Sequence, residues 1–185
     1  MNLRKKRLLA SLGSRLWVSV CTSARAALVS MDDAFWGSDS ITFDSDTGLE
    51  WLDVTLTTNQ SALQILTRLS DESDGLFGFR YATHSELDTL FFTSGGISLE
   101  IQSPIDDPAV DDLMLIVGST LYGSLYQTTQ TRGYFDVDDG SLDDGMTGWA
   151  FLSSSVVLDY TSAGIAVNAA FNDNQSAYNG SWLVR

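Results

Sequence analysis

Hydrophobic and polar positions alternate over two short stretches near the start of the acidic part of the chain. Residues 40–44 and 49–54 are rich in β-branched, aromatic and aliphatic side chains. The segment between them, residues 45–48, ends in Gly48, which can adopt a positive φ in a turn. The pattern predicts a β-hairpin. Polar and apolar residues fall on both faces of its second strand, so neither face is cleanly apolar.

Helical spacing follows in residues 59–69. Asn59 is the expected N-cap, because its side chain can accept a hydrogen bond from the first turn. The apolar residues recur every three or four positions and form one buried stripe, made of Ala62, Ile65, Leu66 and Leu69. A loop rich in Asp and Ser comes next, and residues 78–82 are expected to form a short strand.

Two further helices are predicted. Thr83 and Glu86 form the Thr-x-x-Glu capping-box pattern, so a second helix starts there and continues through Phe91. The third helix is expected to begin near Pro108 and to run through Val117.

Beyond Gly118 the pattern is that of strands separated by clusters of Gly, Asp and Asn. The sequence contains no internal repeat and no linker, and its length suits a single core. We therefore expect one α+β domain with an N-terminal β-hairpin, two or three short helices and an antiparallel strand-rich C-terminal half. The expected strands of that half are residues 121–127, 133–137, 149–158 and 181–184.

Residues 1–26 have the three parts of a secretory signal peptide. Basic residues 1–7 precede an apolar stretch that residues 13–15 interrupt, and residues 24–26 form a small-x-small cleavage site. We expect cleavage between Ala26 and Ala27, which exports residues 27–185 as the domain. A disordered or amphipathic basic leader is the alternative. No run of about 18 apolar residues is present, so the sequence predicts no transmembrane anchor.

Cleavage would separate two oppositely charged segments. Six of the ten basic residues precede the first acid, Asp32, within a chain of formal net charge −14. The segment after residue 26 keeps four arginines, no lysine and all 24 acids, a net charge of −20, and it loses Cys21, the single cysteine. A polyanion is repelled by phosphate, which excludes nucleic acid as a partner. Cations or neutral glycans fit this charge better.

One acidic segment is a candidate calcium site, because Ca²⁺ prefers carboxylate oxygens. The spacing differs from that of an EF-hand, and an acidic surface loop between two strands is the alternative. No other cofactor is predicted. Residues 44–48 raise the same question, but a hairpin turn already explains Asp and Gly there. The five candidate ligands are Asp136, Asp138, Asp139, Asp143 and Asp144.

Catalytic chemistry finds little support in the sequence. His84 is the single histidine, so a Ser-His-Asp triad would require it and a zinc site with two histidines is excluded within one chain. Its place at a helix start favours a solvated cap residue, and we assign no catalytic residue. Four tryptophans could stack on sugar rings, although aromatic residues in strands are more often core: Trp36, Trp51, Trp149 and Trp182.

Three motifs, taken in order, resemble a known family. They are Asp-Thr-Gly-Leu-Glu-Trp-Leu-Asp at residues 46–53, Gly-Phe-Arg-Tyr-Ala-Thr at 78–83 followed by Glu86-Leu87, and Gly-Ser-Trp-Leu-Val-Arg at 180–185. The sequence resembles the exosortase-sorted PEP-CTERM surface proteins of bacteria, in the subgroup with a Gly-Leu-Glu-Trp-Leu-Asp opening. It is more distantly similar to the C-terminal domain of a collagen-like adhesin (Lcl), which implies a C-type-lectin-like fold.

The resemblance implies a location at the cell surface or in the extracellular matrix, with polysaccharide or matrix as the partner, and it carries no catalytic residues. In that family a Pro-Glu-Pro sorting signal follows the Leu-Val-Arg strand, whereas this sequence stops at Arg185. Either the protein is released without an anchor, or this sequence is a truncated product of a longer gene.

The leading hypothesis is therefore a non-catalytic exported protein that acts by binding or structure. A Ca²⁺-assisted glycan-binding module is the alternative, and an extracellular polysaccharide hydrolase that uses acidic residues is the third.

Overall fold

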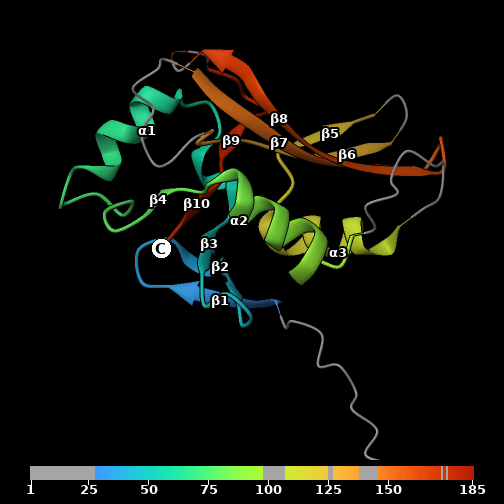
Figure 1. Ribbon diagram of the computed structural model, residues 1–185, viewed down its shortest axis with the longest axis horizontal. Helices are drawn as coiled ribbons and strands as arrows, with labels where there is room; N and C mark the ends of the chain where they lie inside the picture. Colours follow the sequence, from blue (N-terminus) through green and yellow to red (C-terminus); the bar gives the residue numbers. More distant parts are fainter. Residues whose placement is uncertain (1–27, 98–106, 125–126, 138–145, 172, 174) are drawn as a thin grey trace, which may run out of the picture.

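Two β-sheets and the helices between and beside them form the domain (Figure 1). The computed structural model describes residues 28–97, 107–124, 127–137, 146–171, 173 and 175–185. Helices and mainly antiparallel sheets occur together, so the prediction of an α+β fold is confirmed. Among the described residues, no helix is both long and apolar enough to cross a membrane.

The first sheet brings together strands from both ends of the domain. The predicted hairpin is present, with Thr42 of one strand opposite Trp51 of the other. Gly48 in the connecting turn has φ 75°, as a tight turn requires. The strand order is β1 (Leu28–Asp33), β2 (Gly37–Asp44), β3 (Glu50–Leu52), β10 (Leu183–Val184) and β4 (Arg80–Tyr81).

The second sheet follows a meander of three antiparallel strand pairs. A two-residue strand, β9 (Gly180–Ser181), adds in parallel to β6. The order along the meander is β5 (Leu121–Gly123), β6 (Thr128–Phe135), β7 (Met146–Ser155) and β8 (Tyr160–Phe171).

The first helix, α1 (Ala62–Leu69), starts two residues later than the sequence predicts. Ser61 is the N-cap, and it forms a reciprocal capping box with Gln64. The expected cap, Asn59, has φ 61° and precedes the helix. The predicted stripe faces inward: Ala62 and Ile65 are buried, and the other two members are half-buried. A short 3-10 turn, η1 (Val54–Thr57), lies between β3 and α1.

The two further predicted helices are present as α2 (His84–Asp88) and α3 (Pro108–Val117). The Thr83–Glu86 capping box is present at α2, and Asp107 caps α3 ahead of Pro108 at the first helical position. A π-helical turn, η2 (Thr89–Ser94), continues from α2. Figure 1 shows α2 and α3 between the two sheets, where they cover one face of the second sheet.

Two apolar cores lie on opposite sides of β3 and β10. In β3, Trp51 packs into the core formed with α2, η2, α3 and the second sheet, whereas the next residue, Leu52, packs into the core beside α1. Trp182 and Leu183 divide in the same way. The hairpin strand that showed no clean apolar face is therefore a central strand with both faces covered.

Two missed strands and several strand boundaries differ from the sequence prediction: β5 ends at Gly123 rather than at residue 127, and β6 spans Thr128–Phe135 rather than residues 133–137. β1 and β8 were not predicted, and β8 is the longest strand, with 12 residues. Its Ala, Gly, Ser and Asn residues have weak β-propensity, and register against β7 holds it instead. The strand predicted over residues 181–184 divides into β9 and β10, and β7 ends at Ser155 rather than continuing to residue 158.

Gly180 allows the main chain of β9 to lie directly against the main chain of η1. At Gly180 in β9, an added Cβ would overlap the main-chain carbonyl oxygen of Val54 in η1. Backbone cannot rotate away as a side chain can, so a substitution here must displace either β9 or η1.

We therefore expect Gly180→Ala to destabilise the protein by about 1–3 kcal/mol, lowering Tm by several degrees in a thermal melt. Gly123→Ala in β5 is the matched control, because the nearest atom to its added Cβ lies 3.7 Å away. Equal melting temperatures for the two variants would contradict this account of Gly180.

Candidate functional site

The residues of the first and last motifs lie together as part of the framework. The Arg185 Nε donates to the Glu50 Oε2 at 2.6 Å, and an Arg185 Nη2 donates to Asp33 at 3.0 Å. The main chains of Glu50 and Arg185 also exchange two hydrogen bonds of 3.0 Å each. The guanidinium of Arg185 lies 4.5 Å from the ring centre of Phe79. These contacts tie β10 to β3.

Asp53, which closes the first motif, also has a structural role. Its carboxylate accepts hydrogen bonds from the Thr55 amide at 2.8 Å and from the Thr55 hydroxyl at 2.6 Å, which caps η1. Burial raises the pKa of the Asp53 carboxyl despite these hydrogen bonds.

The middle motif forms a closed cluster at the start of α2. Arg80 donates to both carboxylate oxygens of Glu86, at 2.9 and 2.6 Å, and the Thr83 amide donates to the same carboxylate at 2.9 Å. The hydrogen bond from Arg80, followed by those from Thr83, lowers the pKa of Glu86 to about 2. The cluster positions the capping box and leaves Glu86 ionised.

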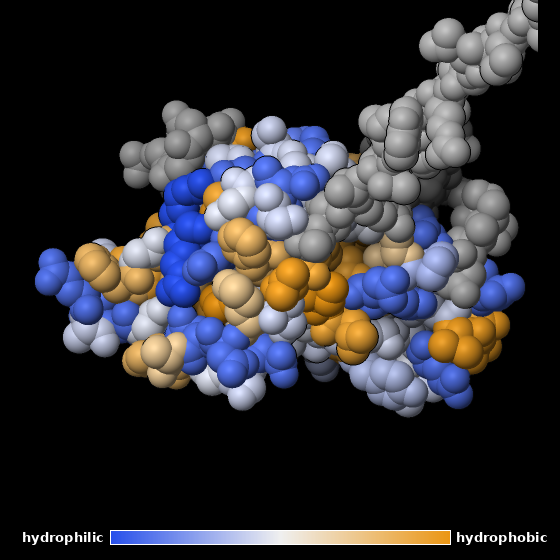
Figure 2. All heavy atoms as spheres, turned by 90° about the horizontal axis from the view of Figure 1, so that it is seen from below, coloured by the Kyte–Doolittle hydropathy of each residue, from blue (hydrophilic) through white to orange (hydrophobic). Residues whose placement is uncertain are grey.

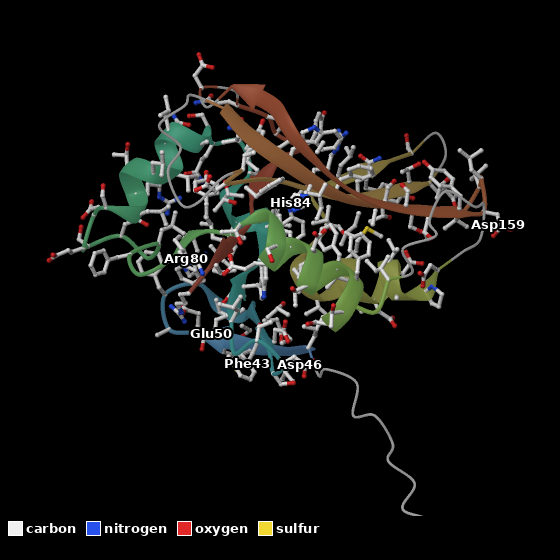
Figure 3. The ribbon with its side chains drawn as sticks, in the orientation of Figure 1. Phe43, Asp46, Glu50, Arg80, His84 and Asp159 are labelled. Carbon is white, nitrogen blue, oxygen red and sulfur yellow. The ribbon has the colours of Figure 1, made fainter. Side chains whose placement is uncertain are left out.

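His84 lies on α2, away from Arg80 and Glu50, as Figure 3 shows. Its Nδ1 lies 3.4 Å from an Asp88 carboxylate oxygen, one helical turn further on, and both side chains are close to half exposed. Its ring centre is 6.0 Å from that of Phe135. The described polar contact of His84 is thus a local pair on its own helix.

The predicted calcium ligands fall largely outside the described residues. Asp138, Asp139, Asp143 and Asp144 all do, as do Ala26 and Ala27 of the predicted cleavage site. Asp136 is described: it is 2% exposed at the end of β6, and its amide donates to the Ala82 carbonyl at 3.0 Å. Within the described part of the chain, no group of three or more His, Cys, Asp or Glu residues could hold a metal ion.

The second acidic segment is explained by its turn. Asp44 is fully buried, where it accepts hydrogen bonds from the Ser94 hydroxyl at 2.7 Å and from the Asp46 amide at 2.9 Å. These contacts hold the hairpin connection and dock η2 against β2.

The four tryptophans of the proposed stacking platform divide into two pairs. Trp51 and Trp182 are each 1% exposed and belong to the core, as expected for aromatic residues in or beside strands. Trp36 and Trp149 are half-buried, and an arginine lies over each ring. Only the second pair can offer an aromatic surface to a ligand.

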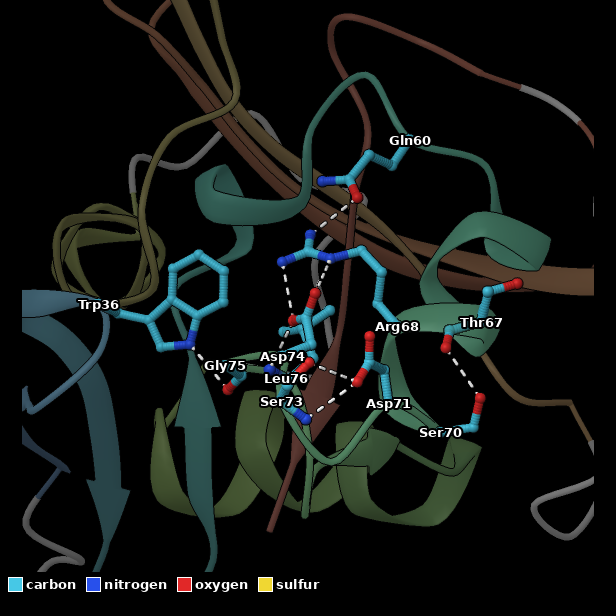
Figure 4. Close-up of polar contacts among 10 residues, drawn as sticks. All are labelled: Trp36, Gln60, Thr67, Arg68, Ser70, Asp71, Ser73, Asp74, Gly75 and Leu76. Atoms are coloured by element: carbon cyan, nitrogen blue, oxygen red, sulfur yellow. Dashed lines mark hydrogen bonds and ion pairs between the residues drawn. The ribbon is translucent and has the colours of Figure 1, made fainter.

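Each guanidinium nitrogen of the arginine over Trp36 donates to a protein group (Figure 4). Arg68 lies 5.5 Å from the ring centre and forms two hydrogen bonds with Asp74, at 2.9 and 3.0 Å. Its remaining amino group donates to Gln60 at 2.8 Å, and the Trp36 indole donates to the Gly75 carbonyl. This cluster fixes the loop after α1 and has few donors left to offer.

Arg132 presents the opposite situation. Its guanidinium carbon lies 4.9 Å from the ring centre of Trp149, but the group makes no hydrogen bond and no ion pair within the described part of the chain. The other three arginines after residue 27 each pair with a carboxylate. Its Nε is buried without a partner. An unpaired cation in so acidic a chain is a candidate binding group.

Aromatic and polar side chains surround Arg132 on one face of the second sheet. Trp149 and Phe151 stack with ring centres 5.0 Å apart, and Phe151 has room for its ring because Gly164 lies opposite. Strand alternation places them on the face opposite Ala150 and Leu152, which pack into the core. We call this surface the Arg132 face and define it by Gln130, Arg132, Trp149 and Phe151.

The Arg132 face was not identified from the sequence, although Trp149 was one of the proposed stacking residues. The available signal was alternation: Gln130 and Arg132 are polar positions in a strand whose partners at residues 149–155 carry no charge. No known family model, curated protein or solved structure matches the chain.

The Arg80–Glu86 pair predicts a pH-dependent stability. A carboxyl whose pKa is lowered by folding stabilises the folded state above its ordinary value of 4.5, and this contribution is lost as the pH falls toward 2. Arg80→Met should therefore lower the free energy of unfolding by about 1 kcal/mol at neutral pH, and by progressively less below pH 4.5. Urea unfolding across this range measures the difference.

Arg132→Met is the matched control, because Arg132 has no carboxylate partner among the described residues. Its effect on stability should not change over the same pH range. A constant offset between Arg80→Met and the unaltered protein would show that Arg80 does not set the pKa of Glu86.

Proposed function

We propose that this protein is an exported, non-catalytic protein of the bacterial cell surface or extracellular matrix that acts by binding or by structure. The observation that carries the proposal is that the residues of the three motifs form ion pairs within the protein or are buried in its core. Glu50, Arg185 and Glu86 are ion-paired, and Trp51 and Trp182 are buried. The motifs that resemble surface proteins thus serve the framework, which supports a scaffold role rather than a reaction centre.

The finer fold assignment belongs to the same proposal. A C-type-lectin-like arrangement is supported by the pairing of β10 with β3, which brings the last strand back to the first sheet, and by a second sheet beyond the helices. The acidic composition and the leader support export.

Export is tested by sequencing the N-terminus of the protein recovered outside a bacterial host. We expect it to begin at Ala27, because cleavage signals require small residues before the cut. Ala26→Arg should block processing, whereas Ser23→Thr serves as a conservative control. Recovery of the chain only inside the cell with Met1 retained would refute export.

A second candidate function, a glycan-binding module, is favoured by the Arg132 face. Stacked aromatic rings offer an apolar surface to the C–H face of a sugar, and a free guanidinium is a fork of donors for its oxygens. The negative field of the domain already balances the cation, so the ligand need not be charged. A neutral glycan fits these groups and the overall charge.

Binding to an array of neutral oligosaccharides tests this candidate. For any glycan that binds, Arg132→Gln should weaken affinity by about tenfold or more, since it removes the charged donor fork. Arg68→Gln is the matched control: it alters the other arginine–tryptophan pair, whose donors are already engaged. Equal losses in both variants would show that the effect is on folding, and the absence of any binding glycan would reject the candidate.

The proposal that Ca²⁺ assists glycan binding rests on the acidic sequence of residues 136–144. Calorimetric titration with Ca²⁺, together with a thermal melt in Ca²⁺ and in EDTA, tests it. No heat of binding and no calcium-dependent change in Tm would remove calcium from the proposal.

A further inference from the structure

Asn179 and Gly180 form the single Asn-Gly pair in the sequence, and the third motif begins at this glycine. An asparagine followed by glycine is prone to react with its own main chain, because glycine has no side chain to hinder the approach of its amide nitrogen. Asn179 is half-buried and directly precedes β9, whereas Gly180 is the buried first residue of that strand. The pair thus joins a labile sequence to a place that water can reach.

The reaction of such a pair is a cyclisation followed by hydrolysis. The Gly180 amide nitrogen loses its proton to hydroxide and bonds to Cγ of Asn179, and the Asn179 side-chain nitrogen takes a proton from water and leaves as ammonia. Water then opens the resulting succinimide. Attack at Cγ restores the main chain and gives aspartate, whereas attack at the main-chain carbonyl carbon gives isoaspartate. Water is the only co-reactant, and no oxidation or reduction takes place.

In the folded domain both reacting groups of the pair are held in place. The Asn179 Nδ2 donates to the Tyr134 hydroxyl at 3.1 Å, which fixes the carboxamide to β6. Gly180 lies so close to Val54 that an added Cβ would overlap the carbonyl oxygen of that residue. The main chain of Gly180 therefore has no room to turn toward the Asn179 side chain while β9 is in place.

The residues that follow the pair fix the same main chain. The Ser181 amide donates to the Thr57 hydroxyl at 2.7 Å, and the Trp182 amide donates to the Tyr134 carbonyl at 2.8 Å. Ser181 and Trp182 are both buried. Turning the peptide group of the pair would break these hydrogen bonds, so cyclisation requires that β9 first open.

Isoaspartate at position 179 does not fit the folded structure. It adds one carbon atom to the main chain directly before β9, where Gly180 lies opposite Gly133 of β6. The close contact between Gly180 and Val54 leaves no space to absorb the extra atom. A chain that carries isoaspartate therefore cannot return both β9 and Trp182 to their places.

We propose that Asn179 is a site of spontaneous deamidation that the folded domain suppresses, and that its isoaspartate product prevents β9 from docking again once the strand has opened. This inference goes beyond the proposed function, because it holds whichever ligand the protein binds. β10 begins two residues after β9 ends, so the product also displaces the strand that lies between β3 and β4.

Displacement of β10 would enlarge an apolar surface. Figure 2 looks onto the side of the molecule where the first sheet lies, and apolar side chains gather near the centre of that face. Val29 in β1 of this sheet is already 46% exposed. Without β10, strands β3 and β4 lose their shared neighbour and Leu183 loses its place in the core. Chains that carry isoaspartate should therefore aggregate more readily than unreacted chains.

Peptide mass spectrometry of the full chain at mildly alkaline pH measures the reaction. Deamidation changes the mass of the peptide, whereas isomerisation of an Asp-Gly pair does not. We expect deamidation at Asn179 to be at least about tenfold faster in guanidinium chloride that unfolds the protein than in the folded state, because the reaction requires opening of β9. Equal rates in the folded and unfolded protein would overturn the proposal.

A pair of matched variants tests the part played by Tyr134. Tyr134→Phe removes the hydroxyl that accepts from Asn179 and should raise the rate in the folded protein by about fivefold, with no change in guanidinium chloride. Tyr81→Phe removes the other buried hydroxyl of the same core, which contacts Ser181 instead, and should leave the rate unchanged. Thermal melts verify that both variants fold. Equal rates in the two variants would refute the role of Tyr134.

Refolding tests the fate of the product. After dilution from guanidinium chloride, chains with isoaspartate at position 179 should be missing from the folded, protease-resistant fraction. Asn179→Asp is the matched control, because it carries the charge of the other product without the extra main-chain atom, and it should refold with an unchanged Tm. Isoaspartate at position 179 in folded protein of unchanged Tm would overturn the proposal.

Discussion

The insertion of β10 between β3 and β4 is the interaction on which the rest of the structure depends. Two main-chain hydrogen bonds and an ion pair join Glu50 to Arg185, and Leu183 lies opposite Tyr81 on the other side. This strand places Val184 in one core and Leu183 in the other, and Trp182, which directly precedes it, packs with Val184 in the first. Each core would lose a fully buried side chain without it, at a cost of several kcal/mol for a residue as large as tryptophan.

The same constraint explains how the polar groups are used. In a domain with four arginines, three are committed to carboxylates that hold strands, a helix cap or a loop in place. Arg132 differs because its strand lies in a sheet with no carboxylate on its strands, so its guanidinium lies over the ring of Trp149 without an ion-pair partner among the described residues. The three paired arginines therefore belong to the framework of the domain, and the remaining one, Arg132, forms the candidate site.

Elements with local signals were predictable, and elements held by distant partners were not. The Thr83 capping box, Pro108 and the turn at Gly48 each act through residues a few positions away, so their helices and hairpin followed from the sequence. Asn59 was the expected cap, but Ser61 takes that role, because Gln64 lies three residues after Ser61 and completes a capping box. β8 has weak intrinsic preference for a strand, and pairing with β7 determines it.

The sequence alone determined the α+β class, the net charge of the segment after residue 26 and the local caps, because composition and short-range spacing control all three. Tertiary structure decided which tryptophans are core and which arginine, among the described residues, has no carboxylate partner. Arg68 and Arg132 both lie over a tryptophan, and they differ only in whether the fold brings a carboxylate within hydrogen-bonding distance. That distance depends on the packing of segments far apart in the chain, which no local pattern specifies.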